Sequence, residues 1–256
     1  MISKLLQNGL LWHAASHSVH TAAQTAVFGL SEIDGKLPER GLCLGAVHEW
    51  CLEQELSSHR KTFWSAPLLL LSSLIAHNMR CSPLLSGKNI AWVGRRCWPT
   101  PALLNAAFNQ TQDFNWRTNS LFIHPANTEE SLWSACEILR SPCIGAAVID
   151  GSSFNAAASR RLQLHARKSS VLGLLVKQPW KIGSSSAAHT KWKITTTPSP
   201  TANPRWRIEL LRCRGAPESS SWLIEYNPRT TSEAIKAHRE NIHLYLPADM
   251  VDRPNS

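Results

Sequence analysis

Lys61 and Thr62 are the first residues whose types and order could do chemistry. In the pattern G-x-x-x-x-G-K-T, backbone amides cradle phosphates while the Lys and Thr serve the β/γ-phosphates and magnesium. Here the two glycine positions hold Glu55 and Arg60. A carboxylate at position 55, with Glu53 close by, repels a triphosphate, and arginine lacks the conformational freedom of glycine. The sequence therefore predicts a degenerate phosphate loop.

Asp150 is a second residue of chemical interest, because it ends the apolar run 144–149. The carboxyl end of a buried parallel strand is where a magnesium-coordinating aspartate of the Walker-B type lies. The alternative is a structural carboxylate that bonds the turn at 151–153. Without a competent phosphate loop we expect the structural role. We predict that the chain binds no cofactor, with ATP and magnesium as the alternative.

Metal and nucleophile chemistry finds no support in the residue spacing. The seven cysteines are scattered and form no C-x-x-C pair, which argues against a zinc cluster or a disulfide framework and for a reducing cytosol. His13, His17 and His20 share one helical side, but no carboxylate or cysteine completes a metal site. No G-x-S-x-G is present. We therefore expect no metal and no catalytic residue.

The net charge of +9 comes from one part of the chain. Residues 1–158 contain 11 basic and 11 acidic residues, whereas residues 159–256 contain 16 basic and 7 acidic ones. Within 159–215 there are 12 Lys and Arg against one acid, Glu209. Such a charge favours a polyanion, most often nucleic acid, although a merely solvated basic face is the alternative. The residues predicted to bind the polyanion are Arg160, Arg161, Lys168, Lys177, Lys181, Lys191 and Lys193, with Trp180 placed to stack on a base.

The elements that must position these residues alternate between strands and helices. Apolar strand patterns at 46–50, 89–94, 120–124, 144–150 and 171–177 are separated by helical patterns at 65–78, 101–109, 127–140 and 155–168. This rhythm predicts a parallel sheet flanked by helices. Three strands of period two follow, at 191–197, 205–213 and 221–226, and they predict a half-exposed antiparallel extension.

The two ends of the chain are expected to lie apart from this core. Residues 1–26 predict a short amphipathic helix at 2–15 and a polar linker. The helix is expected to pack either on its own domain or on another copy of the chain, which would be a route to self-association. Residues 227–256 predict a polar, flexible tail with one short helix near 232–239. No apolar run reaches the roughly 20 residues that span a bilayer, and no secretion leader is evident, so we expect a cytoplasmic protein without membrane contact.

Several of these segments together resemble a known core. Phe28–Asp34, followed by G-L-C-L-G-A-V-H-E at 41–49, resembles the beginning of the RecA core, where G-L-P-x-G-x-x-x-E leads into the phosphate loop. The segments 129–139, 144–150 and 174–183 fall in the order of the helix, the Walker-B strand and the strand before the second DNA loop of RecA.

The chain is more similar to the ImuA family, RecA-like accessory proteins of bacterial translesion synthesis. The segments that carry this resemblance are Leu132–Trp133, 139–141, 160–164, 172–175 and 221–223, and above all R-W-R-I-E-L-L-R-C-R-G at 205–215. The resemblance covers residues 27–226 and implies a RecA-like P-loop NTPase core there. The same core occurs in SulA, a shorter cell-division inhibitor.

The resemblance implies an SOS-induced, nucleoid-associated factor without catalysis of its own. Its implied partners are an ImuB-type polymerase-like protein, an error-prone C-family DNA polymerase, and a RecA filament or single-stranded DNA. The glutamate that activates water in RecA falls at 94–98, which contain no acid, and Gln178 falls on a nucleotide-sensing glutamine of RecA. The alternatives are a weak RecA-type ATPase using Lys61, Thr62 and Asp150, or a SulA-like inhibitor of cell division.

Overall fold

The structure, a computed structural model, describes residues 24–53, 66–108, 114–178, 181–201, 203–215, 219–228 and 240–247. The helices of this part of the chain are α2 (Ser31–Asp34), α3 (Leu68–Cys81), α4 (Pro101–Phe108), α5 (Trp116–Asn119), α6 (Thr128–Arg140) and α7 (Ala156–Ala166), with a 3-10 turn at Arg95–Cys97. The strands are β1 (Thr25–Ala26), β2 (Leu42–Cys43), β3 (Ala46–Glu53), β4 (Asn89–Val93), β5 (Ser120–Ile123), β6 (Ile144–Asp150), β7 (Leu172–Lys177), β8 (Thr190–Thr197), β9 (Arg205–Cys213), β10 (Ser220–Tyr226) and β11 (Leu244–Tyr245).

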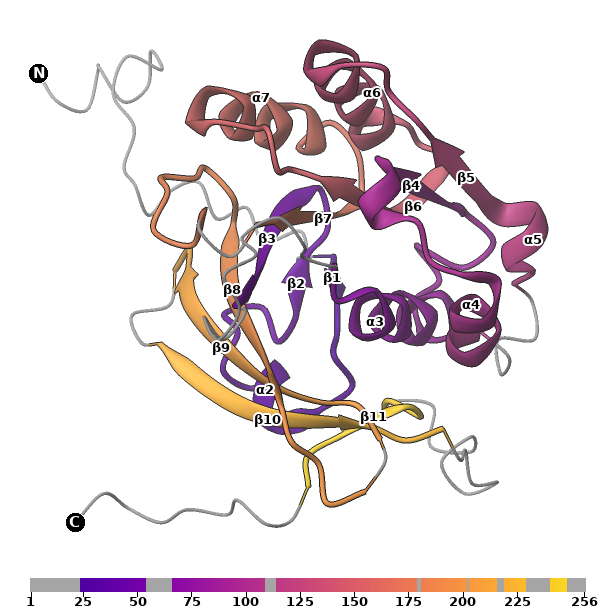
Figure 1. The fold of residues 1–256 in the computed structure, drawn as a ribbon. Helices are drawn as coiled ribbons and strands as arrows, with labels where there is room; N and C mark the ends of the chain where they lie inside the picture. The colour runs from indigo at the N-terminus through magenta and orange to yellow at the C-terminus, as the bar shows by residue number, and fades with distance from the viewer. Residues whose placement is uncertain are drawn as a thin grey trace, which may run out of the picture.

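One nine-stranded sheet organises the described residues, in the order β11-β10-β9-β8-β3-β7-β6-β4-β5. The strands from β8 through β3 to β5 pair in parallel, and the pairs from β8 to β11 are antiparallel. The expected α/β fold, a mostly parallel sheet with a C-terminal antiparallel extension, is thereby confirmed. Figure 1 shows the extension in orange and yellow, curving away from the helices.

Helices cover the parallel part of the sheet on both faces (Figure 1). Alternate residues of each strand point to opposite faces, so that Trp50 and Trp92 join the core under α3 and α4. Val47 and Ile149 join the core under α6 and α7. Strands covered on both faces need continuous apolar runs, which explains why the run at 144–149 predicted a strand.

The start of α6 carries a reciprocal pair of capping hydrogen bonds. The side chain of Asn127 accepts a hydrogen bond from the backbone N–H of Glu130 at 2.9 Å, and the carboxylate of Glu130 accepts one from the N–H of Ala126 at 2.7 Å. Two backbone donors at the helix start are satisfied in this way. The same device starts α7, where Asn155 accepts from the N–H of Ala158 at 2.9 Å.

A crevice forms where the connections change faces. The chain leaves β4 toward α4 on one face and leaves β6 toward α7 on the other, although β4 and β6 are neighbours. In open α/β sheets, ligands bind outside the carboxyl ends of the strands at such a switch point. Asp150, at the end of β6, lies at this place.

The expectation of an unpacked C-terminal tail is wrong for residues 240–247. β11 pairs with β10, and Ile242 and Leu244 are buried. The Asn241 amide group donates to the carbonyl of Phe28 at 2.9 Å, and the backbone N–H of Asn241 donates to the carbonyl of Gly29 at 3.0 Å. These contacts join the tail to the start of the core. The helices expected at 2–15 and 232–239 lie outside the described residues.

Candidate functional site

Three of the predicted site residues lie outside the part of the chain that the structure describes. They are Lys61, Thr62 and Trp180. β3, the strand that precedes Lys61 in the sequence, lies between β7 and β8 in the sheet, and β7 separates it from β6 and Asp150. No helix among the described residues is long and apolar enough to cross a membrane.

Asp150 lies in a crevice of about 550 Å³ at the ends of β4, β5 and β6. Its Oδ2 atom is 3.6 Å from a guanidinium nitrogen of Arg96. Its Oδ1 atom accepts hydrogen bonds from the backbone N–H of Ser152, at 3.0 Å, and from the Ser152 hydroxyl. Gly94 lies against it with a φ of 89°, and a Cβ there would approach the Asp150 Cβ to 2.7 Å. The glycine therefore lets the chain that leaves β4 come close to Asp150 at the end of β6.

These contacts do not fit a magnesium–nucleotide site. Both oxygens of Asp150 already have partners within the chain, and the positive charge beside them is a guanidinium. Magnesium prefers oxygen ligands in octahedral geometry and usually shares them with substrate phosphates. The Ser152 hydrogen bonds are those of a carboxylate that closes the turn at 151–153. We therefore assign no catalytic step to ATP or magnesium at Asp150.

Lys177 and Lys191 are buried side chains, which removes them from a surface that an external polyanion could reach. Lys177 is 1% exposed and Lys191 is 7% exposed. Their ammonium groups lie 3.7 Å and 3.3 Å from the carboxylate of Glu49, which is fully buried on the strand between theirs. They also donate to the carbonyls of Phe154, at 3.2 Å, and Ser184, at 2.8 Å. This correction follows from cross-strand pairing: Glu49 lies opposite Lys191 in the parallel register.

Lys193 belongs to a second ion-pair group, at the partly exposed face of the extension. Its ammonium lies 2.8 Å from Glu53 and 3.3 Å from Glu209. The hydrogen bond from Lys193 is the main reason that the pKa of Glu53 is lowered. Two carboxylates thus balance this lysine, and it contributes little to attracting an anion.

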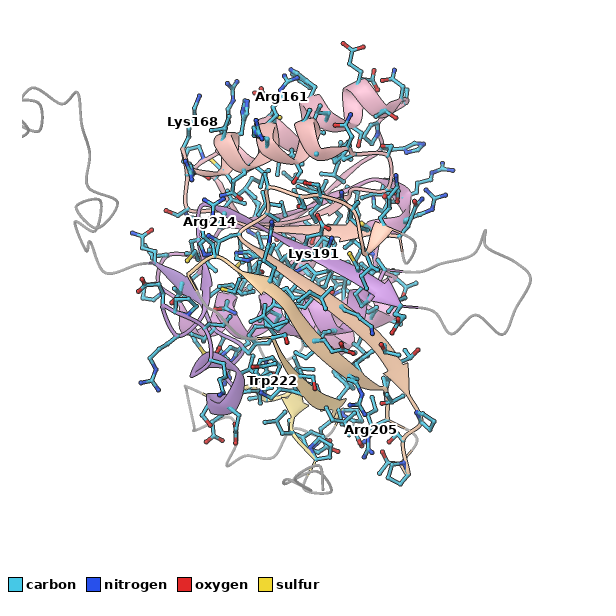
Figure 2. The ribbon with its side chains drawn as sticks, turned by 90° about the vertical axis from the view of Figure 1, so that its left-hand side faces the viewer. Arg161, Lys168, Lys191, Arg205, Arg214 and Trp222 are labelled. Carbon is cyan, nitrogen blue, oxygen red and sulfur yellow. The ribbon has the colours of Figure 1, made fainter. Side chains whose placement is uncertain are left out.

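Arg160, Arg161 and Lys168 are exposed on α7 and directly after it, as expected for a binding surface. Figure 2 shows Arg161 and Lys168 pointing outward from this helix, with Arg214 at the end of β9 on the flank of the molecule. None of the ion pairs formed within the described part of the chain includes Arg160, Arg161 or Lys168.

Three further arginines, which were not among the predicted site residues, gather around His189. Burial lowers the pKa of His189, and the positive charges of Arg214, Arg167 and Arg212 lower it further. All three arginines are exposed. The signal that could have found two of them is the R-C-R sequence at 212–214, at the end of the alternating strand 205–213. We call the six exposed residues the cationic surface: Arg160, Arg161, Arg167, Lys168, Arg212 and Arg214.

Gln178 and Lys181 are half-buried at the start of the loop after β7. The carbonyl of Gln178 accepts a hydrogen bond from the N–H of Lys181 at 3.0 Å, which closes a turn. The same loop is tied to α7 further on, where the N–H of Ala187 donates to the Ser159 hydroxyl at 3.0 Å. The loop therefore lies beside α7 and follows its surface.

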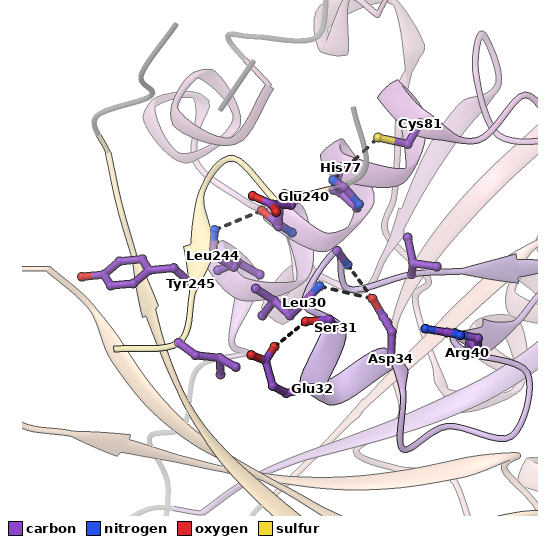
Figure 3. A pocket seen from close by; sticks show the side chains of 14 residues that line it. Leu30, Ser31, Glu32, Asp34, Arg40, His77, Cys81, Glu240, Leu244 and Tyr245 are labelled. Atoms are coloured by element: carbon purple, nitrogen blue, oxygen red, sulfur yellow. Dashed lines mark hydrogen bonds between the residues drawn. The ribbon is translucent and has the colours of Figure 1, made fainter. Parts of the chain in front are cut away.

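A larger cavity, of about 1070 Å³, lies between the turn at 27–34, the end of α3 and the tail (Figure 3). Its most buried acid, Asp34, accepts hydrogen bonds from the N–H groups of Phe28, Gly29 and Leu30 at 2.8, 2.9 and 3.2 Å. Burial nevertheless raises the pKa of Asp34 to about 6. Because both carboxylate oxygens hold the backbone turn, this group has a structural role.

The fold and the crevice place the chain among the open α/β proteins with a mostly parallel sheet. No family model matches the chain. Two curated proteins from two strains of Caulobacter vibrioides, each named Protein ImuA, are 29% identical to it over 218 residues, which cover 77% of this chain and 82% of each relative. This similarity supports membership of the ImuA family, as the resemblance at 205–215 implied.

Proposed function

We propose that this chain is a non-catalytic accessory factor of translesion DNA synthesis in the SOS response to DNA damage. The similarity to the two curated ImuA proteins supports a role in the mutagenesis system. In this proposal the chain binds DNA or a RecA–DNA filament and brings an ImuB-type protein and an error-prone C-family polymerase to it. Its contribution is positioning, without bond-making.

The cationic surface is the observation that carries the DNA-binding part of the proposal. Other basic residues of the same region are neutralised within the fold: Lys177 and Lys191 by Glu49, Lys193 by Glu53 and Glu209. The six residues of the cationic surface have no such carboxylate among the described residues. Unbalanced positive charge attracts a polyanion and releases its counterions on binding.

The ion pair between Arg96 and Asp150 supports the absence of nucleotide turnover. A general base or a metal-binding carboxylate must be available to the substrate. Here the strand-end carboxylate is engaged by Arg96 and Ser152. The degenerate sequence before Lys61 adds an independent argument, because Glu55 and Arg60 replace the two glycines that a phosphate loop needs.

Removing charge from α7 tests the proposal. We expect the triple variant Arg160→Ala/Arg161→Ala/Lys168→Ala to bind a fluorescent single-stranded oligonucleotide about 100-fold more weakly near 0.1 M salt. The slope of log K against log salt should become shallower by about 2, because three phosphate contacts are lost. Fluorescence anisotropy across a salt titration measures both quantities.

The matched control removes the same charge elsewhere, with Lys36→Ala/Lys88→Ala/Arg117→Ala, and should bind like the parent chain. Equal affinities and slopes for both triple variants would contradict DNA binding by α7. An ATP turnover that is present in the parent chain and lost in Lys61→Ala would contradict the non-catalytic role and favour the RecA-type ATPase.

A further inference from the structure

The most exposed large apolar side chains among the described residues lie on two neighbouring helices. Trp133 on α6 is 59% exposed, and Leu164 on α7 is 54% exposed. α6 and α7 lie side by side over the parallel sheet (Figure 1). Exposed apolar side chains that lie close together indicate a contact surface, whereas isolated ones do not.

A groove runs along these helices. One part, of about 350 Å³, lies between the start of α6 and the start of α7, and Leu132, Ala157 and Arg161 are in its lining. A second part, of about 550 Å³, lies on the outer side of α7. Ala157 and Arg161 line both parts, so the two are adjacent. We call this the helix groove, defined by Leu132, Ala157, Arg160, Arg161, Leu164 and Lys168.

The rim of the helix groove is positive. Arg160 and Arg161 come from α7, and Lys168 follows shortly after its end. Burial and the charges of Lys168, Arg161 and Arg140 together lower the pKa of His165, which lines the groove, while Glu137 has the opposite effect. Glu137 itself is paired with Arg140. The groove therefore combines an apolar floor with an excess of positive charge.

We infer that the helix groove docks an acidic amphipathic helix of a partner protein. Leucine or similar side chains of this helix would cover Leu164, Ala157 and Leu132, and its glutamates or aspartates would face Arg160, Arg161 and Lys168. The groove follows α7, whose 11 residues span about 16 Å, or about three turns of a docked helix. The inference goes beyond the proposed function, which requires positive charge alone.

The groove shares Arg160, Arg161 and Lys168 with the DNA-binding part of the proposed function, and its apolar side chains are the feature that favours a peptide. Phosphate contacts use cations and hydrogen-bond donors, and single-stranded bases stack on exposed aromatic faces. Of the aromatic rings in the lining, Phe154 is 2% exposed and His165 is half-buried, and the exposed apolar residue is Leu164. Leucine and alanine between arginines suit the apolar stripe and acidic flanks of an amphipathic helix.

The experiment uses Leu164→Ser, which removes the apolar contact and leaves every charge in place. The probe is a fluorescein-labelled synthetic peptide of about 15 residues, with leucines along one helical face and glutamates elsewhere. We expect it to bind the full chain, and Leu164→Ser to weaken binding about 10-fold, as expected for one leucine returned to water. Binding of the oligonucleotide should stay the same in this variant.

The matched control is Leu211→Ser, which removes a leucine exposed on β9, outside the helix groove. It should leave peptide binding unchanged, and circular dichroism shows that both variants fold. No binding of the peptide, or equal peptide affinity in Leu164→Ser and the parent chain, would overturn the inference. So would a loss of oligonucleotide binding in Leu164→Ser, because the groove would then hold DNA. The peptide and the oligonucleotide are measured separately, so a failure of the peptide experiment with oligonucleotide binding intact is distinguishable from a failure of the proposed function.

Discussion

Single residues in this chain take their roles from the charges that surround them. Lys177, Lys191 and Lys168 are the same residue type within one basic region, yet two are buried against Glu49 and one is exposed at the end of α7. A buried lysine needs a partner, because the free-energy cost of removing its charge from water is several kcal/mol. Glu49 is that partner for two lysines at once.

The Glu49 cluster leads to a prediction on stability. Glu49→Gln preserves the shape of the side chain but leaves the ammonium groups of Lys177 and Lys191 without a counter-charge. We expect the free energy of unfolding to fall by about 3 to 5 kcal/mol, the usual cost of breaking a buried ion pair. Urea denaturation measures it. Glu137→Gln, in an exposed pair with Arg140, should cost less than about 1 kcal/mol; similar losses in both variants would contradict the role given to Glu49.

His48 has one tautomer that satisfies all of its neighbours. The indole N–H of Trp192 donates to the Thr190 hydroxyl at 2.7 Å, and this hydroxyl lies 2.8 Å from Nδ1 of His48. Nε2 lies 2.9 Å from the carbonyl of Cys43 and therefore donates to it. Nδ1 must then accept from Thr190. A second proton on His48 would break this chain of hydrogen bonds.

The neutral state of His48 predicts how stability depends on pH. Burial lowers its pKa to about 3, and the unfolded value is about 6.5. Between these values the unfolded chain binds a proton that the native chain does not, so the free energy of unfolding falls as the pH falls from 6.5 toward 3. We expect His48→Gln to reduce this slope by about 1.4 kcal/mol per pH unit. Urea titrations between about pH 6 and 4 measure the slope, and an unchanged slope would refute the assignment.

At the scale of elements, the tail strand β11 depends on one asparagine. Besides its bond to Phe28, the Asn241 side chain accepts hydrogen bonds from the N–H groups of His243 and Leu244, both at 3.0 Å. The side chain fixes the turn that brings Leu244 into the core beside β10. A strand of two residues has too little pairing of its own to stay in place.

We expect Asn241→Ala to lower the free energy of unfolding by about 1 to 3 kcal/mol, because buried backbone groups lose their partners. The amide of Leu244 should then exchange with solvent faster, while amides of β6 in the centre of the sheet should keep their protection. Hydrogen exchange followed by NMR distinguishes the two. A loss of protection throughout the sheet would mean that the tail is part of the cooperative core, and unchanged exchange at Leu244 would mean that Asn241 does not hold it.

Across the whole molecule, the sheet joins two surfaces of different character. α7 and the turn after it carry four of the six residues of the cationic surface, and the antiparallel extension carries ion pairs that neutralise Lys193 and Arg205. The helix groove shares Arg160, Arg161 and Lys168 with the cationic surface, so a partner helix and a polyanion would meet on the same side of the sheet.

The sequence by itself determined the order of the main helices and strands along the chain and the alternation in 205–213, because these depend on neighbours within a few residues. It also determined where the positive charge is concentrated. Only the tertiary structure decided that Lys177 and Lys191 face Glu49, that Arg96 reaches Asp150, and that residues 240–247 join the core. Burial and ion pairing are set by residues distant in the chain, and local periodicity carries no information about which of them will meet.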